Sequence, residues 1–187
     1  YVRRRMPLYP NAREFLRAVE TRYRSLPGYS DTGLSRSFGS RKPRMCTFET
    51  AYAAPTRFRF AFETSHPYRP LAHHVSKDVI GTDGTTVYFY SRSYDGRTDV
   101  EHPESLMMAV AGATGISSGT AHTIGALLFE EVGGFRLTDM RRIRFRSTRE
   151  VDGVKCVAVS GLHPGGRGRV TAWFGTEDLL LRRLVRN

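Results

Sequence analysis

The residues with the clearest potential for chemistry lie in the stretch GATGISSGTAHT, residues 112–123. Its centre fits the G-x-S-x-G motif of serine hydrolases around Ser117, and His122 follows five residues later. In those hydrolases the serine stands on a sharp turn between a buried strand and a helix. Here the flanking residues are typical of helices on both sides. We therefore expect a flexible link rather than a nucleophile, and a Ser117 esterase is the weakest of the functional alternatives.

Histidines suggest a second chemistry, metal binding. His66, His73 and His74 are followed by Asp78 and Asp83. Adjacent residues of a strand point to opposite faces, so His73 and His74 are poorly placed to share one ion. The chain has none of the H-E-x-x-H, C-x-x-C or H-x-H spacings of zinc sites. We expect no metal site and no cofactor.

The elements that must position such residues begin with a helix, predicted over residues 11–26. Asn11 is suited to cap it, with Glu14 at the capping-box spacing. Apolar residues then recur on one stripe, and Pro27 with Gly28 ends the pattern.

The hydrophobic period then changes from 3.6 to 2, which indicates strands. The sequence RFRFAFE at residues 57–63 alternates most clearly, with phenylalanines on one face and charged residues on the other. The other predicted strands cover residues 29–38, 45–52, 75–80, 86–91, 140–149, 155–160, 169–174 and 179–185.

A helical insert at residues 103–133 interrupts the strands. It begins with an apolar, small-residue segment at 106–111 and includes a predicted helix at 123–132. The order contains no alternation of strand, helix and strand that would indicate a parallel sheet. We therefore expect an α+β fold, with residues 1–187 forming a single domain after a basic N-terminal extension at 1–10.

Charge and cysteine content limit which partners and which cellular compartments are compatible with the chain. The 29 Lys and Arg against 18 Asp and Glu give a formal charge of +11, which attracts anions such as anionic membranes or polyanions. The two cysteines, Cys46 and Cys156, are compatible with either one disulfide or two free thiols. The start YVRRRMPLYP lacks the apolar region of a signal peptide, and we expect a trimmed chain whose original N-terminus has been removed.

Arginines interleaved with aromatic residues suggest a binding surface for anions. The predicted basic surface consists of Arg57, Arg59, Arg141, Arg142, Arg144 and Arg146. Single-strand binders of nucleic acid combine positive charge with aromatic residues in this way. Outward arginines that alternate with inward Ile143 and Phe145 are equally typical of an amphipathic strand. A polyanion- or nucleic-acid-binding domain is therefore the main alternative function, although no recognised nucleic-acid motif accompanies the charge.

Three stretches carry a resemblance to a known family. The sequence VIGTDGTTVYFY at residues 79–90 resembles the strand-turn-strand signature of the periplasmic lipoprotein carriers, the LolA/LolB-like fold. The sequence APTRFRF at 54–60 is similar to that family's proline followed by an aromatic-basic strand, and WFGTEDLLLRR at 173–183 is similar to its closing hairpin. The resemblance points to an uncharacterised exported branch of this fold.

The resemblance implies a curved antiparallel sheet forming an incomplete β-barrel, covered by an N-terminal helix and the short helical insert. A hydrophobic cavity would then lie beneath the insert, which would act as a lid. The residues expected to line it are Phe48, Phe58, Phe60, Phe62, Val87, Phe89, Leu106, Met107, Met108, Leu127 and Leu128. The same residues are also able to pack on one another as a closed core, and both possibilities remain.

One position departs from the family pattern. The carrier has an arginine before the proline of the aromatic-basic strand, where it bonds to the lid, and this chain has Ala54. We therefore expect a lipid or acylated ligand to be bound without that latch. We therefore expect a non-enzymatic, monomeric, periplasmic or otherwise exported bacterial protein that meets an anionic membrane surface or a membrane protein, with nucleic acid as the less favoured partner.

Overall fold

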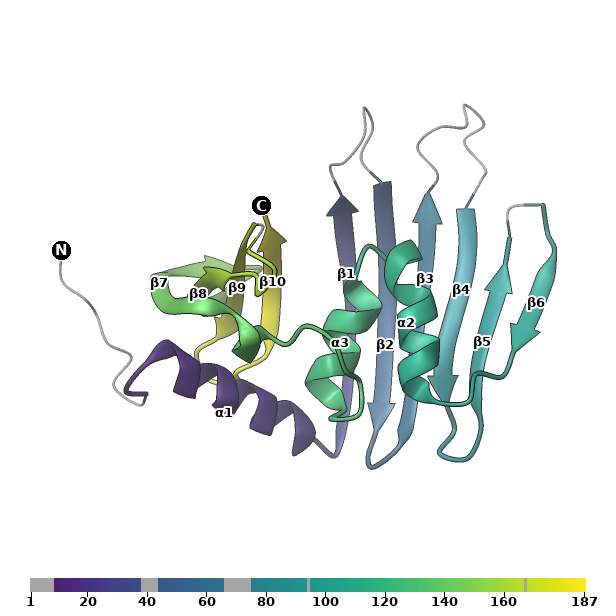
Figure 1. Cartoon of the computed structure of the whole chain (residues 1–187), viewed down its shortest axis with the longest axis horizontal. Coiled ribbons are helices and arrows are strands. Elements are labelled where there is room, and N and C mark those ends of the chain that lie inside the picture. Colours follow the sequence, from purple (N-terminus) through teal and green to yellow (C-terminus); the bar gives the residue numbers. More distant parts are fainter. Residues whose placement is uncertain (1–8, 38–43, 66–74, 94, 167) are drawn as a thin grey trace. The chain divides into compact units, whose positions relative to one another are not determined.

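The computed structural model describes residues 9–37, 44–65, 75–93, 95–166 and 168–187 (Figure 1). Most of the predicted extension at 1–10 and the histidines His66, His73 and His74 lie outside the described residues. The chain forms two compact units. We call Leu26–Gly133 the central unit, and Tyr1–Ser25 with Gly134–Asn187 the terminal unit. The single domain expected from the sequence stays a prediction.

The central unit contains a six-stranded antiparallel sheet in which each strand pairs with the next one along the chain (Figure 1). Its strands are β1 (Gly28–Ser37), β2 (Arg44–Ala53), β3 (Arg57–Ser65), β4 (Val75–Thr82), β5 (Val87–Arg92) and β6 (Thr98–Glu101). Two helices follow the sheet, α2 (Leu106–Ile116) and α3 (Thr120–Leu128). Figure 1 shows both helices on the same face of the sheet.

Strand alternation divides this sheet into a covered face, under α2 and α3, and an open face. On β3 the phenylalanines Phe58, Phe60 and Phe62 point to the covered face and are at most 2% exposed. Phe129, which follows α3, packs its ring edge-on against Tyr52 and Phe58 at centroid distances of 5.4 and 5.3 Å. The apolar surface of the helices therefore meets the aromatic side of the sheet.

The terminal unit contains a four-stranded antiparallel sheet and helix α1. Its elements are α1 (Ala12–Arg24), the short 3-10 helix η1 (Leu137–Asp139), β7 (Arg141–Val151), β8 (Val154–Leu162), β9 (Arg169–Gly175) and β10 (Leu181–Arg186). The strands are ordered β10-β9-β8-β7. Phe15 on α1 packs against the rings of Phe145 and Phe174, each at 5.6 Å, so one apolar stripe of the helix contacts the sheet.

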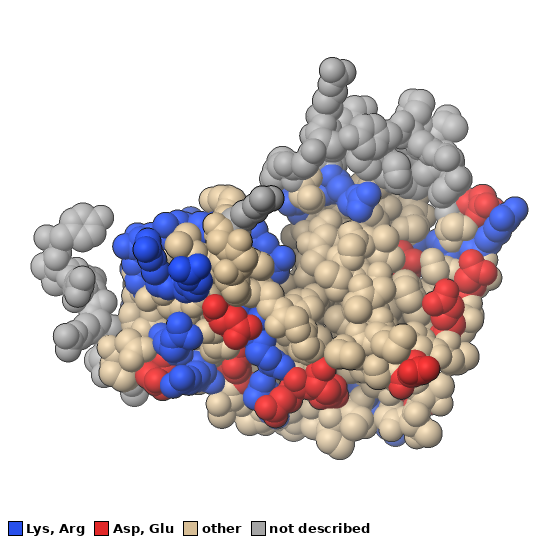
Figure 2. All heavy atoms as spheres, in the orientation of Figure 1, with Lys and Arg blue, Asp and Glu red and all other residues tan. Residues whose placement is uncertain are grey.

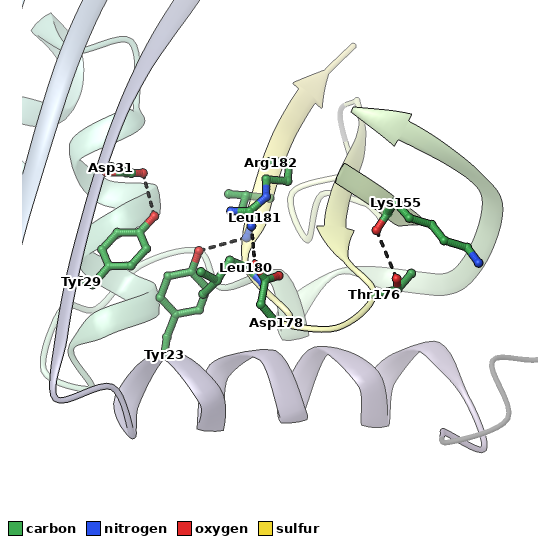
Figure 3. A network of polar contacts seen from close by, with 9 residues as sticks. All are labelled: Tyr23, Tyr29, Asp31, Lys155, Thr176, Asp178, Leu180, Leu181 and Arg182. Carbon is green, nitrogen blue, oxygen red and sulfur yellow. Dashed lines mark hydrogen bonds and ion pairs between the residues drawn. The ribbon is translucent and has the colours of Figure 1, made fainter. Parts of the chain in front are cut away.

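Polar contacts also join α1 to its sheet. Asn11 caps the helix, because its side chain accepts hydrogen bonds from the backbone of Arg13 and Glu14. Near the other end the buried Tyr23 hydroxyl accepts a hydrogen bond of 3.0 Å from the backbone of Leu181 (Figure 3). Asp178 holds the preceding turn by accepting from Leu180 and pairing with Arg182 (Figure 3). The early helix predicted from the sequence is thus confirmed and firmly attached within its unit.

The predicted α+β class with antiparallel sheets is confirmed, and neither sheet closes into a barrel among the described strands. The insert differs in detail from the prediction. The segment expected at 106–111 extends as α2 to Ile116. The helix predicted at 123–132 begins three residues earlier and ends at Leu128, because Phe129 is extended. Ser105 caps α2 by accepting from Met108, a signal that the sequence prediction did not use.

Candidate functional site

The covered face of the central unit brings most of the predicted cavity residues together. Phe58, Phe60, Phe62, Leu106, Leu127 and Leu128 are buried. Phe48, Val87 and Phe89 are half-buried. Phe48 stacks on Phe60 at 5.3 Å, and the ring of Phe89 lies 3.4 Å from the position that a Cβ atom on Gly112 would take. This arrangement is a packed aromatic layer beneath the insert.

Met107 and Met108 correct the predicted lining. Their side chains are 47% and 50% exposed, so they lie outside the packed layer. The cap at Ser105 sets the helical register, which turns Ala109 and Val110 inward and leaves the two methionines on the outer side. Their apolar character is real, but it faces away from the sheet.

Helices α2 and α3 of the insert carry no charged side chain on either side. The chain has no Asp, Glu, Lys or Arg between residues 106 and 129. The exposed side of α2 consists of Met107, Met108, Ala111, Gly112, Gly115 and Ile116. In Figure 2 an uncharged surface occupies the region where Figure 1 places α2. Monomeric proteins seldom expose a contiguous apolar patch without a function for it.

Polar atoms beneath the insert are incompletely satisfied. Asp78 is 2% exposed; its Oδ1 accepts a 2.6 Å hydrogen bond from the Ser91 hydroxyl, and its Oδ2 has no partner among the described residues. Thr50 Oγ1 and Asp31 Oδ1 are also buried without a partner in this part of the chain. Buried polar groups are normally hydrogen-bonded, so these three positions are places where a ligand or water would be stabilised.

The G-x-S-x-G serine has a structural role. Ser117 is 0% exposed, and its Oγ accepts a 3.2 Å hydrogen bond from the backbone of Ala121 at the start of α3. Ser118 and Gly119 both have positive φ angles, 56° and 83°, which turn the chain sharply between α2 and α3. The expected link between two helices is confirmed.

No base stands next to this serine among the described residues. The His122 ring is bonded through Nε2 to the carbonyl of Gly133 at 2.8 Å. A serine nucleophile needs a base within hydrogen-bond reach. The arrangement therefore offers no support for the esterase alternative.

The cysteines are two free, buried thiols. Burial raises the pKa of Cys46, while side-chain hydrogen bonds from Thr64 and Thr120 act in the opposite direction. Burial likewise raises the pKa of Cys156. Because the thiolate is the reactive form, both groups are poor nucleophiles at neutral pH. The structure thus selects free thiols from the two possibilities that the sequence left open.

The predicted basic surface is divided between the two units. Arg57 and Arg59 lie on the open face of β3, whereas Arg141, Arg142, Arg144 and Arg146 lie on β7. On β7 the expected alternation holds, since Arg142, Arg144 and Arg146 are exposed and Ile143 and Phe145 are half-buried. Two register shifts interrupt the pairing of β7 with β8, and Arg142 has a positive φ of 52°. Arg146 also donates a 2.7 Å hydrogen bond from Nε to the buried Ser160 hydroxyl. Bulges of this kind are hard to predict from a two-residue period.

Two further arginines of the terminal unit stack on its tryptophan. The guanidinium of Arg149 lies 4.3 Å from the centre of the Trp173 ring, and that of Arg183 lies 5.6 Å away. They come from β7 and β10, with Trp173 on β9 between them in the sheet order. The sequence prediction missed this cluster, because its members are far apart along the chain.

Among the described residues no group of three or more His, Cys, Asp or Glu side chains is placed to hold a metal ion. In the same part of the chain, every helix is too short or too polar to cross a membrane.

Comparison with known proteins finds a similar solved structure. No protein-family model and no curated protein matches the chain. A solved structure of a DUF1329 family protein from Desulfovibrio piger is similar over 94% of this chain and 71% of its own chain. The two share 12% sequence identity and superimpose with a TM-score of 0.39.

Proposed function

We propose that the central unit is a non-enzymatic binding module for a lipid or acylated ligand, which it holds at the covered face beneath the α2–α3 insert. The ligand's acyl chain would replace part of the contact between the insert and the aromatic layer of Phe58, Phe60 and Phe62. Removing acyl carbons from water contributes about 0.8 kcal/mol per CH₂, so a chain of ordinary length supplies enough free energy for such an exchange.

The observation that carries this proposal is the absence of charged side chains from α2 and α3 of the insert. Its inner side covers an aromatic sheet face, and its outer side exposes Met107, Met108 and Ile116 to solvent. A helix that only closed a core would gain solubility from charges on its outer side. Apolar residues on both sides suit an element that contacts an apolar ligand or a lipid surface as well as the sheet.

The contact between insert and sheet supports a lid that can move. The inner side of α2 includes the small residues Ala109 and Ala113, both 0% exposed, which bury less apolar area than leucine would. A polar bond at the far end of α2 joins the Thr64 hydroxyl to the carbonyl of Ile116 at 3.1 Å. Gly133 and Gly134, at the end of the insert, provide backbone freedom.

The unsatisfied polar atoms indicate the ligand's chemistry. Asp78 Oδ2 is a buried hydrogen-bond acceptor, and so is Asp31 Oδ1, whereas the Thr50 hydroxyl is able to donate or accept. A ligand that combines an acyl chain with hydroxyl, amide or ammonium donors would satisfy them. Acylated peptides and lipids with hydroxylated or amine-containing head groups have this composition.

The proposed setting is an exported, monomeric protein whose terminal unit meets anionic membranes. That unit has 19 basic and 7 acidic residues, a formal charge of +12. Basic surfaces bind anionic lipid head groups electrostatically. Fractionation of the producing cells tests export, and confinement to the cytoplasmic fraction would contradict it.

Native mass spectrometry with organic extraction is the direct test of ligand binding. We expect an acyl-containing species to remain on the purified protein, or to be acquired from phospholipids or acylated peptides. A mass that stays clean after both incubations would refute the proposal.

A matched pair of variants locates the site. Val87→Arg puts a charge at the half-buried edge of the covered face, and Val100→Arg puts the same charge on the open face, where Val100 is 57% exposed. We expect Val87→Arg to weaken binding of a fluorescent fatty acid about tenfold or more, because a desolvated charge opposes an acyl chain. Val100→Arg should bind as the unaltered protein does, and equal binding by both variants would place the ligand elsewhere.

The Arg149–Trp173–Arg183 cluster favours a second candidate, binding of a polyanion by the terminal unit. Arginines held against an aromatic ring keep their N–H edges available for phosphate groups. Oligonucleotide affinity measured from 50 to 200 mM salt separates the two candidates. An affinity that falls steeply with salt, and that Arg149→Gln and Arg183→Gln abolish, would support polyanion binding. No measurable affinity would refute this second candidate and leave lipid binding as the remaining one.

A further inference from the structure

The open face of the central sheet contains a hollow of about 510 Å³, on the side of the sheet away from the insert. It lies where β1, β3 and β5 begin, at the lower end of the sheet in Figure 1. Its volume is within the range of sites that hold small organic ligands, about 300–1,000 Å³. Arg57, Arg59, Asp83 and Tyr88 contribute polar groups to its lining.

Small residues create this hollow. Across the sheet, Ser30 pairs with Ala51, and Gly28 pairs with Ala53. The side chains of Ser30, Ala51 and Ala53 lie on the open face and Gly28 has none, whereas the larger Tyr29 and Tyr52 lie on the covered face. Because no long side chain rises from this corner of β1 and β2, the floor of the hollow is nearly bare sheet.

Two arginines border that floor. The strand register places Arg59 directly between Ala51 on β2 and Gly81 on β4, and Arg57 opposite Ala53. Side chains two residues apart on a strand share a face, so both guanidiniums rise beside the hollow. Arg59 is 3.9 Å from Glu49, at the limit of an ion pair, and Arg57 makes no ion pair with a described residue.

Tyr88 completes the border. It is the partner of Gly81 in the sheet, and its hydroxyl lies 2.5 Å from the position of a Cβ atom on that glycine. The ring therefore lies across β4 at the level of Arg59, which only a glycine at residue 81 permits. Partial burial raises the pKa of Tyr88, so its hydroxyl remains a hydrogen-bond donor at neutral pH.

The nearest carboxylate is already engaged. Asp83 Oδ1 accepts hydrogen bonds from the backbone of Thr85 and Thr86, each at 2.8 Å, in the turn between β4 and β5. These bonds hold the pKa of Asp83 below its ordinary value, so the group stays ionised as a part of the turn. The charge of Arg57 also lowers the pKa of Asp83, so the carboxylate partly offsets that arginine, while its Oδ1 is used by the turn.

We propose that this hollow binds a phosphate group, which is held by the guanidiniums of Arg57 and Arg59 and by the hydroxyl of Tyr88, with the organic part of the ligand on the small-residue floor. Two arginines match the double negative charge of a phosphate monoester better than the single charge of a carboxylate. Guanidiniums also bind phosphate oxygens through paired N–H groups. The site is separate from the covered face and does not depend on acyl binding.

The first test measures binding of inorganic phosphate and of glycerol 3-phosphate by titration calorimetry and by NMR. Arg57→Gln and Arg59→Gln should each weaken binding about tenfold, the effect of losing one charge-assisted hydrogen bond. Arg92→Gln removes an exposed arginine from the same face, three or more strand positions from the hollow, and should change the affinity less than twofold.

Tyr88→Phe keeps the ring over Gly81 and removes only the hydroxyl. It should weaken phosphate binding by a smaller factor than the arginine variants do. Equal affinity in the unaltered protein, Arg57→Gln and Arg59→Gln would overturn the proposal, as would the absence of any phosphate-dependent shift in the resonances of residues 51–59. Circular dichroism of each variant checks that a loss of binding is not a loss of folding.

Vesicles distinguish the two sources of the phosphate group. If the ligand is a lipid head group, the double variant Arg57→Gln plus Arg59→Gln should bind vesicles containing phosphatidic acid more weakly than Arg92→Gln does, while the attraction between the terminal unit and anionic vesicles stays the same in both variants. If the ligand is a soluble phosphate ester, glycerol 3-phosphate binds and the double variant leaves vesicle binding unchanged. Val87→Arg should leave phosphate binding intact in either case, so failure of acyl binding and failure of this site are separately observable.

Discussion

The terminal and central units differ in charge and in the way their helices are attached. The terminal unit has a formal charge of +12, whereas the central unit, with 10 basic and 11 acidic residues, has a charge of −1. Figure 2 accordingly shows Lys and Arg gathered over the elements of the terminal unit. One chain therefore combines a strongly basic unit, which attracts anions, with a nearly neutral unit that we propose binds an apolar ligand.

The helices follow the same division. Helix α1 contacts its sheet through Phe15, Val19 and Tyr23, all 0% exposed, and through the hydrogen bond to Leu181. Helix α2 buries no aromatic residue; its buried side chains are Leu106, Ala109, Val110 and Ala113. Large aromatic contacts fix a helix more strongly than small aliphatic ones do, because more apolar area leaves water. We infer that α1 is a permanent part of its core and that α2 opens more easily.

The largest expected effect concerns α1. Phe15→Ala should lower the free energy of unfolding by about 3–5 kcal/mol, since it removes a buried ring that contacts Phe145 and Phe174. Urea denaturation followed by circular dichroism measures it. Arg17→Ala, on the exposed side of α1, is the matched control and should change stability by less than about 0.5 kcal/mol. A small effect of Phe15→Ala would contradict the view that α1 is a fixed element.

The reaction rates of the two buried thiols measure how readily each unit opens. Cys46 lies beneath the insert, and Cys156 lies within the terminal sheet, both 0% exposed. If the insert opens more readily, Cys46 in a Cys156→Ala variant should react with a thiol reagent about tenfold faster than Cys156 in Cys46→Ala. Reaction at pH 8 with a disulfide reagent measures both rates, and a bound acyl ligand should change only that of Cys46. Equal rates would remove the distinction between the units.

Removing the helix caps also compares α1 with α2, with a smaller expected loss of stability. Asn11→Ala and Ser105→Ala each remove a side-chain cap and should cost about 1 kcal/mol. The first should lower global stability, whereas the second should mainly speed amide hydrogen exchange in α2. A global loss of stability from Ser105→Ala, equal to that from Asn11→Ala, would indicate that the insert unfolds only with the rest of the protein.

The smallest effect is a dependence on pH in the turn between β4 and β5. Backbone hydrogen bonds from Thr86 and Thr85 lower the pKa of Asp83 in the folded state. The stabilisation is therefore complete above the ordinary aspartate pKa, near 4, and is lost as the pH falls through the lower folded value. Unfolding curves of Asp83→Asn and the unaltered protein should converge in acid. A difference that stays constant from pH 7 to pH 2 would contradict this assignment.

Local sequence patterns predicted the regular parts of the fold. The cap and apolar stripe of α1 and the two-residue period of β3 depend on nearby residues alone, and the structure confirms both. Strand β6 escaped prediction because its four residues, TDVE, are all exposed and carry no apolar alternation. The bulges of β7 were not predicted, because they are register shifts in its pairing with β8, which the sequence of β7 alone does not reveal.

The candidate sites show the same limit. The aromatic residues of β3 were identified from alternation, but the outward position of Met107 and Met108 depends on where α2 begins. The small-residue floor of the hollow could have been predicted from the sequence, since Gly28, Ser30, Ala51 and Ala53 alternate with larger residues. Their meeting with Arg57 and Arg59 needed the strand register.

The sequence by itself determined which residues of each strand share a face, because successive side chains of a strand alternate. It also determined the charge of each part and the uncharged character of residues 106–129. Only the tertiary structure decided that Arg59 stands between Ala51 and Gly81 with Tyr88 laid over the glycine. The physical reason is that cross-strand neighbours are set by register, which depends on turns and on pairing between residues far apart in the chain.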